Sequence, residues 1–203
     1  MMVKSRTESP EIRKRQILDA ARVLLSQRAF EDIRMEDVSR KAQLAKGTLY
    51  LHFKDKSQIM VAVHDDLLSE LELILQGLNG KSGVQLLEQV AKLTLEFLRK
   101  NNDFFLQFSQ TRSALTGTNR TAVLKRFQRH MDLIKSLISK ASEKGEIPAP
   151  EGYIGTLFFI SLIRMFWEKS QLLTLNESGD DVDVLMSLFL GGIQSFSNKG
   201  KKS

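Results

Sequence analysis

The chain has 203 residues, of which 42% are hydrophobic and 27% are charged, as is ordinary for one or two globular domains. It contains no cysteine, which excludes a disulfide framework, a thiolate nucleophile and a cysteine metal site. Its charge of +6 is uneven: residues 1–60 carry 13 basic against 8 acidic residues, and residues 61–203 carry 17 against 16. Such an N-terminal excess is expected where that segment meets a polyanion, although a solvated basic surface would show the same excess.

The sequence has no feature of a secreted or membrane protein. Charged residues interrupt residues 1–30, which leaves no apolar signal segment there. The longest apolar run, 154–163, is about half the length that a membrane-spanning helix of about 20 residues needs. We therefore expect a cytoplasmic protein without a membrane partner.

Helical periodicity dominates the chain, and no run alternates apolar and polar residues as a half-buried strand does. Ser9 followed by Pro10 predicts the start of the first helix. Asp55 with Gln58 three residues later predicts the cap of another. The sequence thus predicts an all-α fold, with helices after the first at about 35–42, 46–53, 56–75, 84–99, 103–113, 119–144, 151–173 and 181–197.

The two short helices, with a three-residue turn between them, predict a helix-turn-helix. Its small core would consist of Val38, Ala42, Leu44 and Leu49. The second helix then keeps five residues outside, which suit a helix lying in the major groove of DNA; they are Lys46, Gly47, Thr48, Tyr50 and His52.

Each of these side chains has a chemical reason to meet DNA. Lys46 can donate to guanine or phosphate, the hydroxyls of Thr48 and Tyr50 can bond to phosphate oxygens, and His52 can donate to phosphate. Lys56 can add a phosphate contact, and Gly47 allows a close approach of the backbone. Taken singly, a half-buried tyrosine, a surface histidine or a frayed helix start explains each residue equally well. Their spacing and the local charge favour DNA binding.

The stretch "AKGTLYLHFKDKSQI", within residues 10–65, resembles the TetR family of one-component transcriptional regulators. The resemblance implies a three-helix DNA-binding domain at 1–56 and a larger domain at 57–203 that binds an effector and forms a dimer. It places the recognition helix at Ala45–Phe53. The residues that it implies for DNA binding are Arg34, Met35, Ala45, Lys46, Gly47, Thr48, Tyr50, His52 and Lys56.

Two positions depart from the family pattern. Arg34 stands where a threonine usually caps the second helix, and an arginine there can still contact phosphate. Gln43 stands where the turn usually has glycine. If this position requires a left-handed backbone, glutamine adopts it at some cost.

Two C-terminal stretches, 154–173 and 182–196, are too apolar to face water as isolated helices. Paired with their symmetry mates they would form a four-helix interface, and Gly191 with Gly192 would permit a close approach. The alternative is that both are central core helices. We expect a homodimer.

Aromatic and methionine side chains suggest a pocket for a small, largely apolar effector, although such residues are more often plain core. Arg164 could anchor an acidic ligand or pair across the dimer. The other candidates for the pocket are Phe104, Phe105, Phe108, Phe127, Met131 and Trp167.

We expect no cofactor, metal site or catalytic residue, because the three histidines match no zinc spacing and no phosphate-binding loop is present. The sequence therefore predicts a homodimeric repressor that binds double-stranded DNA at a palindromic operator and is released by an effector. The alternatives are a helical DNA-binding protein without effector and an all-α enzyme.

Overall fold

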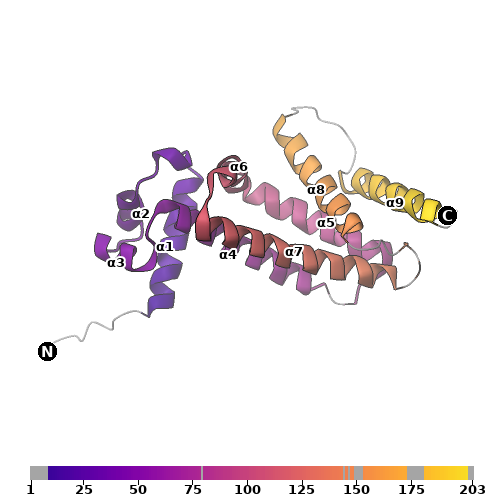
Figure 1. Ribbon diagram of the computed structural model, residues 1–203, viewed down its shortest axis with the longest axis horizontal. Helices are drawn as coiled ribbons and strands as arrows, with labels where there is room; N and C mark the ends of the chain where they lie inside the picture. Colours follow the sequence, from indigo (N-terminus) through magenta and orange to yellow (C-terminus); the bar gives the residue numbers. More distant parts are fainter. Residues whose placement is uncertain are drawn as a thin grey trace. The chain divides into compact units, whose positions relative to one another are not determined.

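A computed structural model describes residues 9–78, 80–143, 145, 147–148, 153–172 and 181–200. Over these residues the chain is helical and without strands, which confirms the all-α prediction. None of the described helices is long and apolar enough to cross a membrane. The α-helices, drawn in Figure 1, are α1 (Pro10–Leu25), α2 (Met35–Lys41), α3 (Lys46–His52), α4 (Lys56–Gln76), α5 (Gly83–Lys100), α6 (Asn102–Thr111), α7 (Gly117–Ser142), α8 (Ile154–Leu172) and α9 (Asp181–Gly200).

The predicted helices all occur, with ends that shift by a few residues. The helix expected at 119–144 ends at Ser142, and the helix expected at 151–173 begins at Ile154; residues 144, 151, 152 and 173 lie outside the described part. The chain divides into two compact units: unit 1 is Met1–Leu67 with Asn102–Leu124, and unit 2 is Leu68–Asn101 with Lys125–Ser203. Unit 1 therefore takes in α6, which the predicted limits of 1–56 and 57–203 assign to the second domain.

Local capping explains the helix starts in unit 1. The side chain of Ser9 accepts a hydrogen bond from the Ile12 amide (3.3 Å), and Pro10 begins α1, as predicted. At α4 the Gln58 amide donates to Asp55 Oδ1 (2.8 Å), while the Lys54 amide donates to Gln58 Oε1 (2.8 Å). This reciprocal pair satisfies two amides that a helix start would otherwise leave open.

The end of α1 is completed by α6. Gln107 Nε2 donates to the carbonyl oxygens of Leu25 (2.6 Å) and Arg28 (3.1 Å). In the same unit the ring of His64, on α4, stacks on Phe108 with centroids 3.9 Å apart, and Phe105 meets it edge-on. Unit 1 is thus assembled from two separate stretches of the chain.

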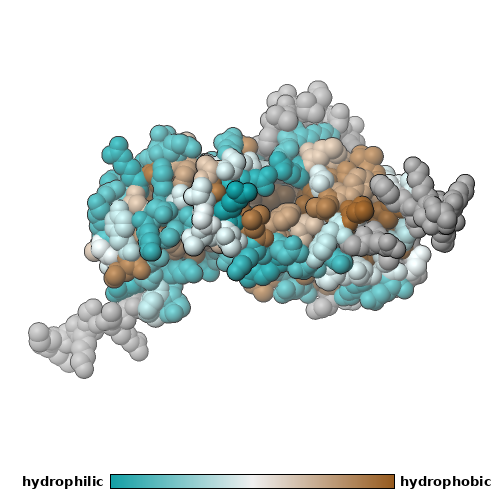
Figure 2. Space-filling model, in the orientation of Figure 1, coloured by the Kyte–Doolittle hydropathy of each residue, from teal (hydrophilic) through white to brown (hydrophobic). Residues whose placement is uncertain are grey.

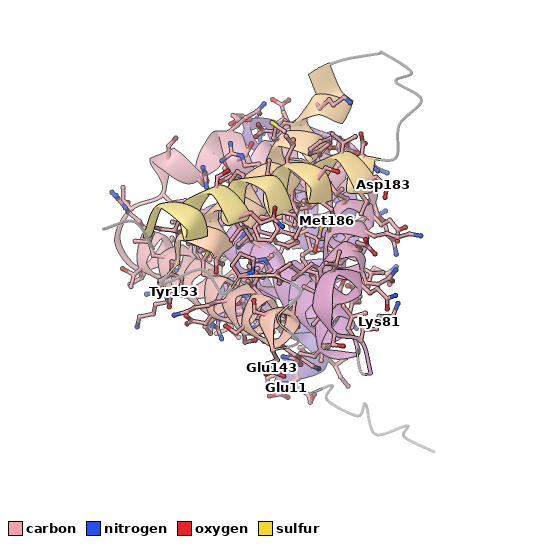
Figure 3. The ribbon with its side chains drawn as sticks, turned by 90° about the vertical axis from the view of Figure 1, so that its right-hand side faces the viewer. Glu11, Lys81, Glu143, Tyr153, Asp183 and Met186 are labelled. Atoms are coloured by element: carbon pink, nitrogen blue, oxygen red, sulfur yellow. The ribbon has the colours of Figure 1, made fainter. Side chains whose placement is uncertain are left out.

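In unit 2, α5 packs against α8 and α9, and its buried face includes Leu86, Leu87 and Val90. Figure 3 shows α9 lengthwise at the front, with exposed Asp183 and buried Met186 labelled. Helices α8 and α9 pack so closely that a Cβ atom added at Gly192 would lie 2.5 Å from Phe158 Cε1. A side chain at this position would have to displace the Phe158 ring.

Candidate DNA-binding surface

The turn between α2 and α3 is a Schellman motif. After Ala42, Gln43 has φ of 57°, in the left-handed region. The Leu44 amide donates to the Ser39 carbonyl (2.9 Å) and the Gln43 amide to the Arg40 carbonyl (3.2 Å), which satisfies two carbonyls at the end of α2. The position where the family usually has glycine is therefore left-handed here, and glutamine adopts that conformation at a cost.

The start of α2 is held by Asp37 rather than by Arg34. Asp37 Oδ2 accepts from the Arg34 backbone amide (3.0 Å), whereas the Arg34 side chain makes no capping hydrogen bond and is exposed. This hydrogen bond is the largest cause that lowers the pKa of Asp37; Arg28 (3.7 Å) and Arg40 (3.5 Å) add to it. Asp37 therefore supplies the half of a capping box in which the N3 carboxylate accepts from the amide of the N-cap residue.

The inner face of the motif is buried as predicted. Leu49 is fully buried on α3, Val38 is buried on α2, and Ala42 and Leu44 are half-buried. This core fixes α3 against α2, so that the opposite side of α3 stays open to solvent.

The outer face of α3 carries Lys46 and Tyr50, both exposed, with the lysine Nζ 6.0 Å from the centre of the tyrosine ring. Leu51, between Tyr50 and His52, is 86% exposed. Sequence reasoning missed Leu51 as a surface residue, because a leucine in an amphipathic helix is ordinarily assigned to the core. An exposed apolar side chain on such a helix suits the methyl group of thymine.

Lys46 has a partner within the motif. Its ammonium forms an ion pair with the carboxylate of Glu36, on α2, which raises the pKa of Lys46 and lowers that of Glu36. Both side chains are well exposed, so a phosphate group can reach the lysine.

Lys56 is engaged in unit 1 as well. Its Nζ donates to the carbonyl oxygens of Phe30 (2.8 Å) and Glu31 (2.9 Å) and lies 4.6 Å from the centre of the Phe30 ring. The ammonium therefore joins the start of α4 to the short helical turn Phe30–Asp32.

The remaining predicted DNA-binding residues have different exposures. Ala45 and Gly47 are exposed, and beyond its chain neighbours and its own helix backbone no atom lies within 4 Å of a Cβ placed on Gly47, which leaves its backbone open to a close approach. Thr48 and His52 are half-buried, and Met35 is buried at the base of α2.

The predicted effector-pocket residues are divided between the two units. Phe104, Phe105 and Phe108 are buried in unit 1, against one another and His64. The candidates in unit 2 differ in burial: Met131 and Trp167 are buried, Phe127 is 45% exposed, and Arg164 is exposed. Arg164 Nε donates to Glu168 Oε1 (2.7 Å).

Unit 2 instead buries an arginine that sequence reasoning did not single out. Arg126, on α7, is 3% exposed, and its Nη1 donates to both carboxylate oxygens of Glu72 (2.8 and 2.9 Å). Its Nη2 lies 3.3 Å from Ser69 Oγ, and His130 Nδ1 lies 3.8 Å from Glu72 Oε1. The only sequence signal is the four-residue spacing of Arg126 and His130, which puts both on one face of a helix.

Comparison with known proteins identifies the N-terminal segment. Residues 17–63 match the model of the bacterial regulatory proteins of the tetR family. An uncharacterised HTH-type transcriptional regulator of Bacillus subtilis, YxbF, is 28% identical over 99 residues, which cover 47% of this chain and 26% of that protein. The chain therefore spans about a quarter of that relative's length.

Solved structures share the whole fold at low sequence identity. The regulator FadR of Bacillus subtilis, solved with stearoyl-CoA, aligns with a TM-score of 0.71 at 16% identity, covering 88% of this chain and 98% of that one. AibR, solved with isovaleryl coenzyme A and operator DNA, aligns with a TM-score of 0.61 at 20% identity, covering 89% and 97%. Residues 17–63 of this chain thus match the tetR-family model, and the chain shares its fold with these regulators.

Proposed function

We propose that the protein is a homodimeric repressor that acts in the cytoplasm, binds a palindromic operator through α3 and leaves it when a small, largely apolar effector binds. The observation that carries the DNA-binding part is the two-sided character of α3. Leu49 is fully buried, while Lys46, Gly47, Tyr50 and Leu51 stand open to solvent beside it. The exposed set offers a charge, a hydroxyl and an apolar group, as base and phosphate contacts require.

The dimer is proposed from exposed apolar residues at helical spacing on α8 and α9. Val184, Leu188 and Gly191 recur every three or four residues on α9, and Ile154 with Leu157 does so on α8; all are exposed. Figure 2 shows hydrophobic atoms gathered over α8 and the start of α9 on the visible face. A patch of this kind marks an interaction site on a soluble protein.

Arg164 lies on α8 next to the exposed Met165 and pairs with Glu168. This position supports a place at the rim of the dimer interface rather than in an enclosed pocket. Rim charges add little to affinity but help to set the register of the partners.

An acyl compound is the effector class that the similar structures suggest, since FadR of B. subtilis was solved with stearoyl-CoA and AibR with isovaleryl coenzyme A. The buried Met131 and Trp167 of unit 2 are apolar side chains suited to such a ligand. Phe104, Phe105, Phe108 and Phe127 stay candidates for the effector pocket.

A DNA-shift assay with genomic fragments, including those that flank the gene, tests the proposal. The protein should retain few fragments, and Lys46→Ala should weaken binding to the retained operator by about 1–3 kcal/mol, more than to random DNA. Lys14→Ala, which removes one exposed lysine from α1, is the matched control for lost charge. Equal retention of all fragments would favour the alternative, a DNA-binding protein without operator preference.

A further inference from the structure

We propose that Arg126 is the anion-binding end of the effector site and that it takes the carboxylate of a monocarboxylic acid with an apolar tail, which replaces Glu72. This inference rests on the proposed ligand response and names the chemical class of the ligand. It places the site on α4 and α7 within unit 2.

The first ground is the burial of the charges. Arg126 is 3% exposed, and the carboxylate of Glu72 accepts from its Nη1 through both oxygens. A buried ion pair costs desolvation and is often no more stable than well-packed apolar residues of the same volume. Stability alone therefore does not account for a guanidinium in this position, and its chemistry suits the recognition of a carboxylate.

The second ground is an unmet hydrogen-bonding group beside the pair. His130 is 9% exposed, and its Nδ1 has no hydrogen-bond partner, because Glu72 Oε1 lies 3.8 Å away. Burial lowers the pKa of His130, so its ring is neutral at pH 7 and carries one N–H. With the ring proton on Nδ1, His130 would donate to a carboxylate seated slightly closer than that of Glu72, and Arg126 would donate to the same carboxylate.

The third ground is that Glu72 can leave without creating a buried unpaired charge. Its side chain is 19% exposed, so it already reaches the surface, and water can solvate the carboxylate once it turns outward. The positive charge of Arg126 stays neutralised, because the ligand carboxylate replaces the carboxylate of Glu72. The apolar tail would then lie along buried side chains of the same two helices, such as Leu75 on α4 and Ile134 on α7.

The exchange also explains how the ligand would be sensed. Arg126 ties α7 to α4 through Glu72 and Ser69, and α4 is the helix that begins at Lys56 beside the DNA-binding motif. A ligand whose carboxylate binds Arg126 has its highest affinity for the state in which the ion pair between Arg126 and Glu72 is broken. Such a difference in affinity between two states is what a ligand-driven change requires.

The experiment measures the binding of octanoate, dodecanoate and hexadecanoate, of the matching alcohols and of the matching coenzyme A thioesters. Binding to the full chain is followed by calorimetry, and release of operator DNA is followed in parallel. The acids should bind better than the alcohols. Glu72→Gln should raise the affinity for the best acid, relative to that for the matching alcohol, by about tenfold, because it removes the competing anion.

A double variant separates ligand binding from a structural role. Replacing Arg126 and Glu72 together by methionine leaves no unpaired charge, so the protein should fold, yet acids should bind no better than alcohols. Replacing the ion pair Arg99–Asp181, whose arginine is exposed and whose aspartate is half-buried, in the same way is the matched control and should keep the preference for acids. Thermal melts establish that each variant is folded.

Three results would overturn the inference: acids bound no better than alcohols, thioesters released DNA while free acids did not, or the double methionine variant kept its preference for acids. The proposed ligand response fails separately, if neither acids, alcohols nor thioesters change the affinity of the parent protein for operator DNA.

Discussion

Replacing Gln43 by glycine should stabilise the protein by about 0.5–1 kcal/mol. Gln43 has φ of 57°, and a left-handed conformation costs a residue with a Cβ atom about 1–2 kcal/mol. Glycine removes that cost but loses about 0.4–1 kcal/mol through its greater freedom in the unfolded chain. The Gln43 side chain is exposed, so little packing is lost, and both hydrogen bonds of the turn are made by backbone atoms.

Urea unfolding at one protein concentration measures the effect. If the unfolding free energy falls with urea at the same slope in both proteins, a higher midpoint urea concentration means a more stable protein. Gln43→Ala is the matched control, because it removes the same side chain and keeps the Cβ atom. A Gln43→Gly protein that is no more stable than Gln43→Ala would refute the claim that the left-handed turn is strained by its side chain.

Four further outcomes are expected. Lys56→Met should lower stability by about 1–3 kcal/mol in urea unfolding, because two carbonyls lose a charged donor. Glu36→Gln should tighten DNA binding and steepen its salt dependence, because the paired lysine is freed for phosphate. In thermal melts Gly192→Leu should destabilise the fold, while Gly191→Leu should leave the fold intact and weaken the dimer seen by sedimentation. His130 has a lowered pKa, so its contribution to stability is present above pH 6.5 and is lost as pH falls through the folded pKa; His130→Gln should flatten the pH profile of the melting temperature.

Local chemistry made the helix starts predictable. Ser9 with Pro10 and Asp55 with Gln58 act over three or four residues, so the sequence alone identifies both caps, and the structure confirms them. At position 43, where the family usually has glycine, the sequence predicted a cost for glutamine only if the backbone is left-handed there. In the structure Gln43 has φ of 57°, which is left-handed.

What the sequence did not reveal depends on contacts between distant segments. Arg126 is buried because α7 packs on α4, some 54 positions earlier, and no local pattern distinguishes it from an exposed arginine. Lys56 reaches the carbonyls of Phe30 and Glu31 for the same kind of reason. Leu51 is exposed although its residue type favours burial, since α2 covers only the side of α3 that carries Leu49.

The hydrogen bonds from Gln107 to the end of α1 have a consequence for synthesis of the chain. The unit that carries the DNA-binding motif takes in residues 102–124, so translation to residue 67 leaves it without α6. At about 5–20 residues per second, the ribosome needs several more seconds before this segment emerges. Until then the apolar side of α4 that meets α6 has no cover, and the motif acquires its native support late in translation.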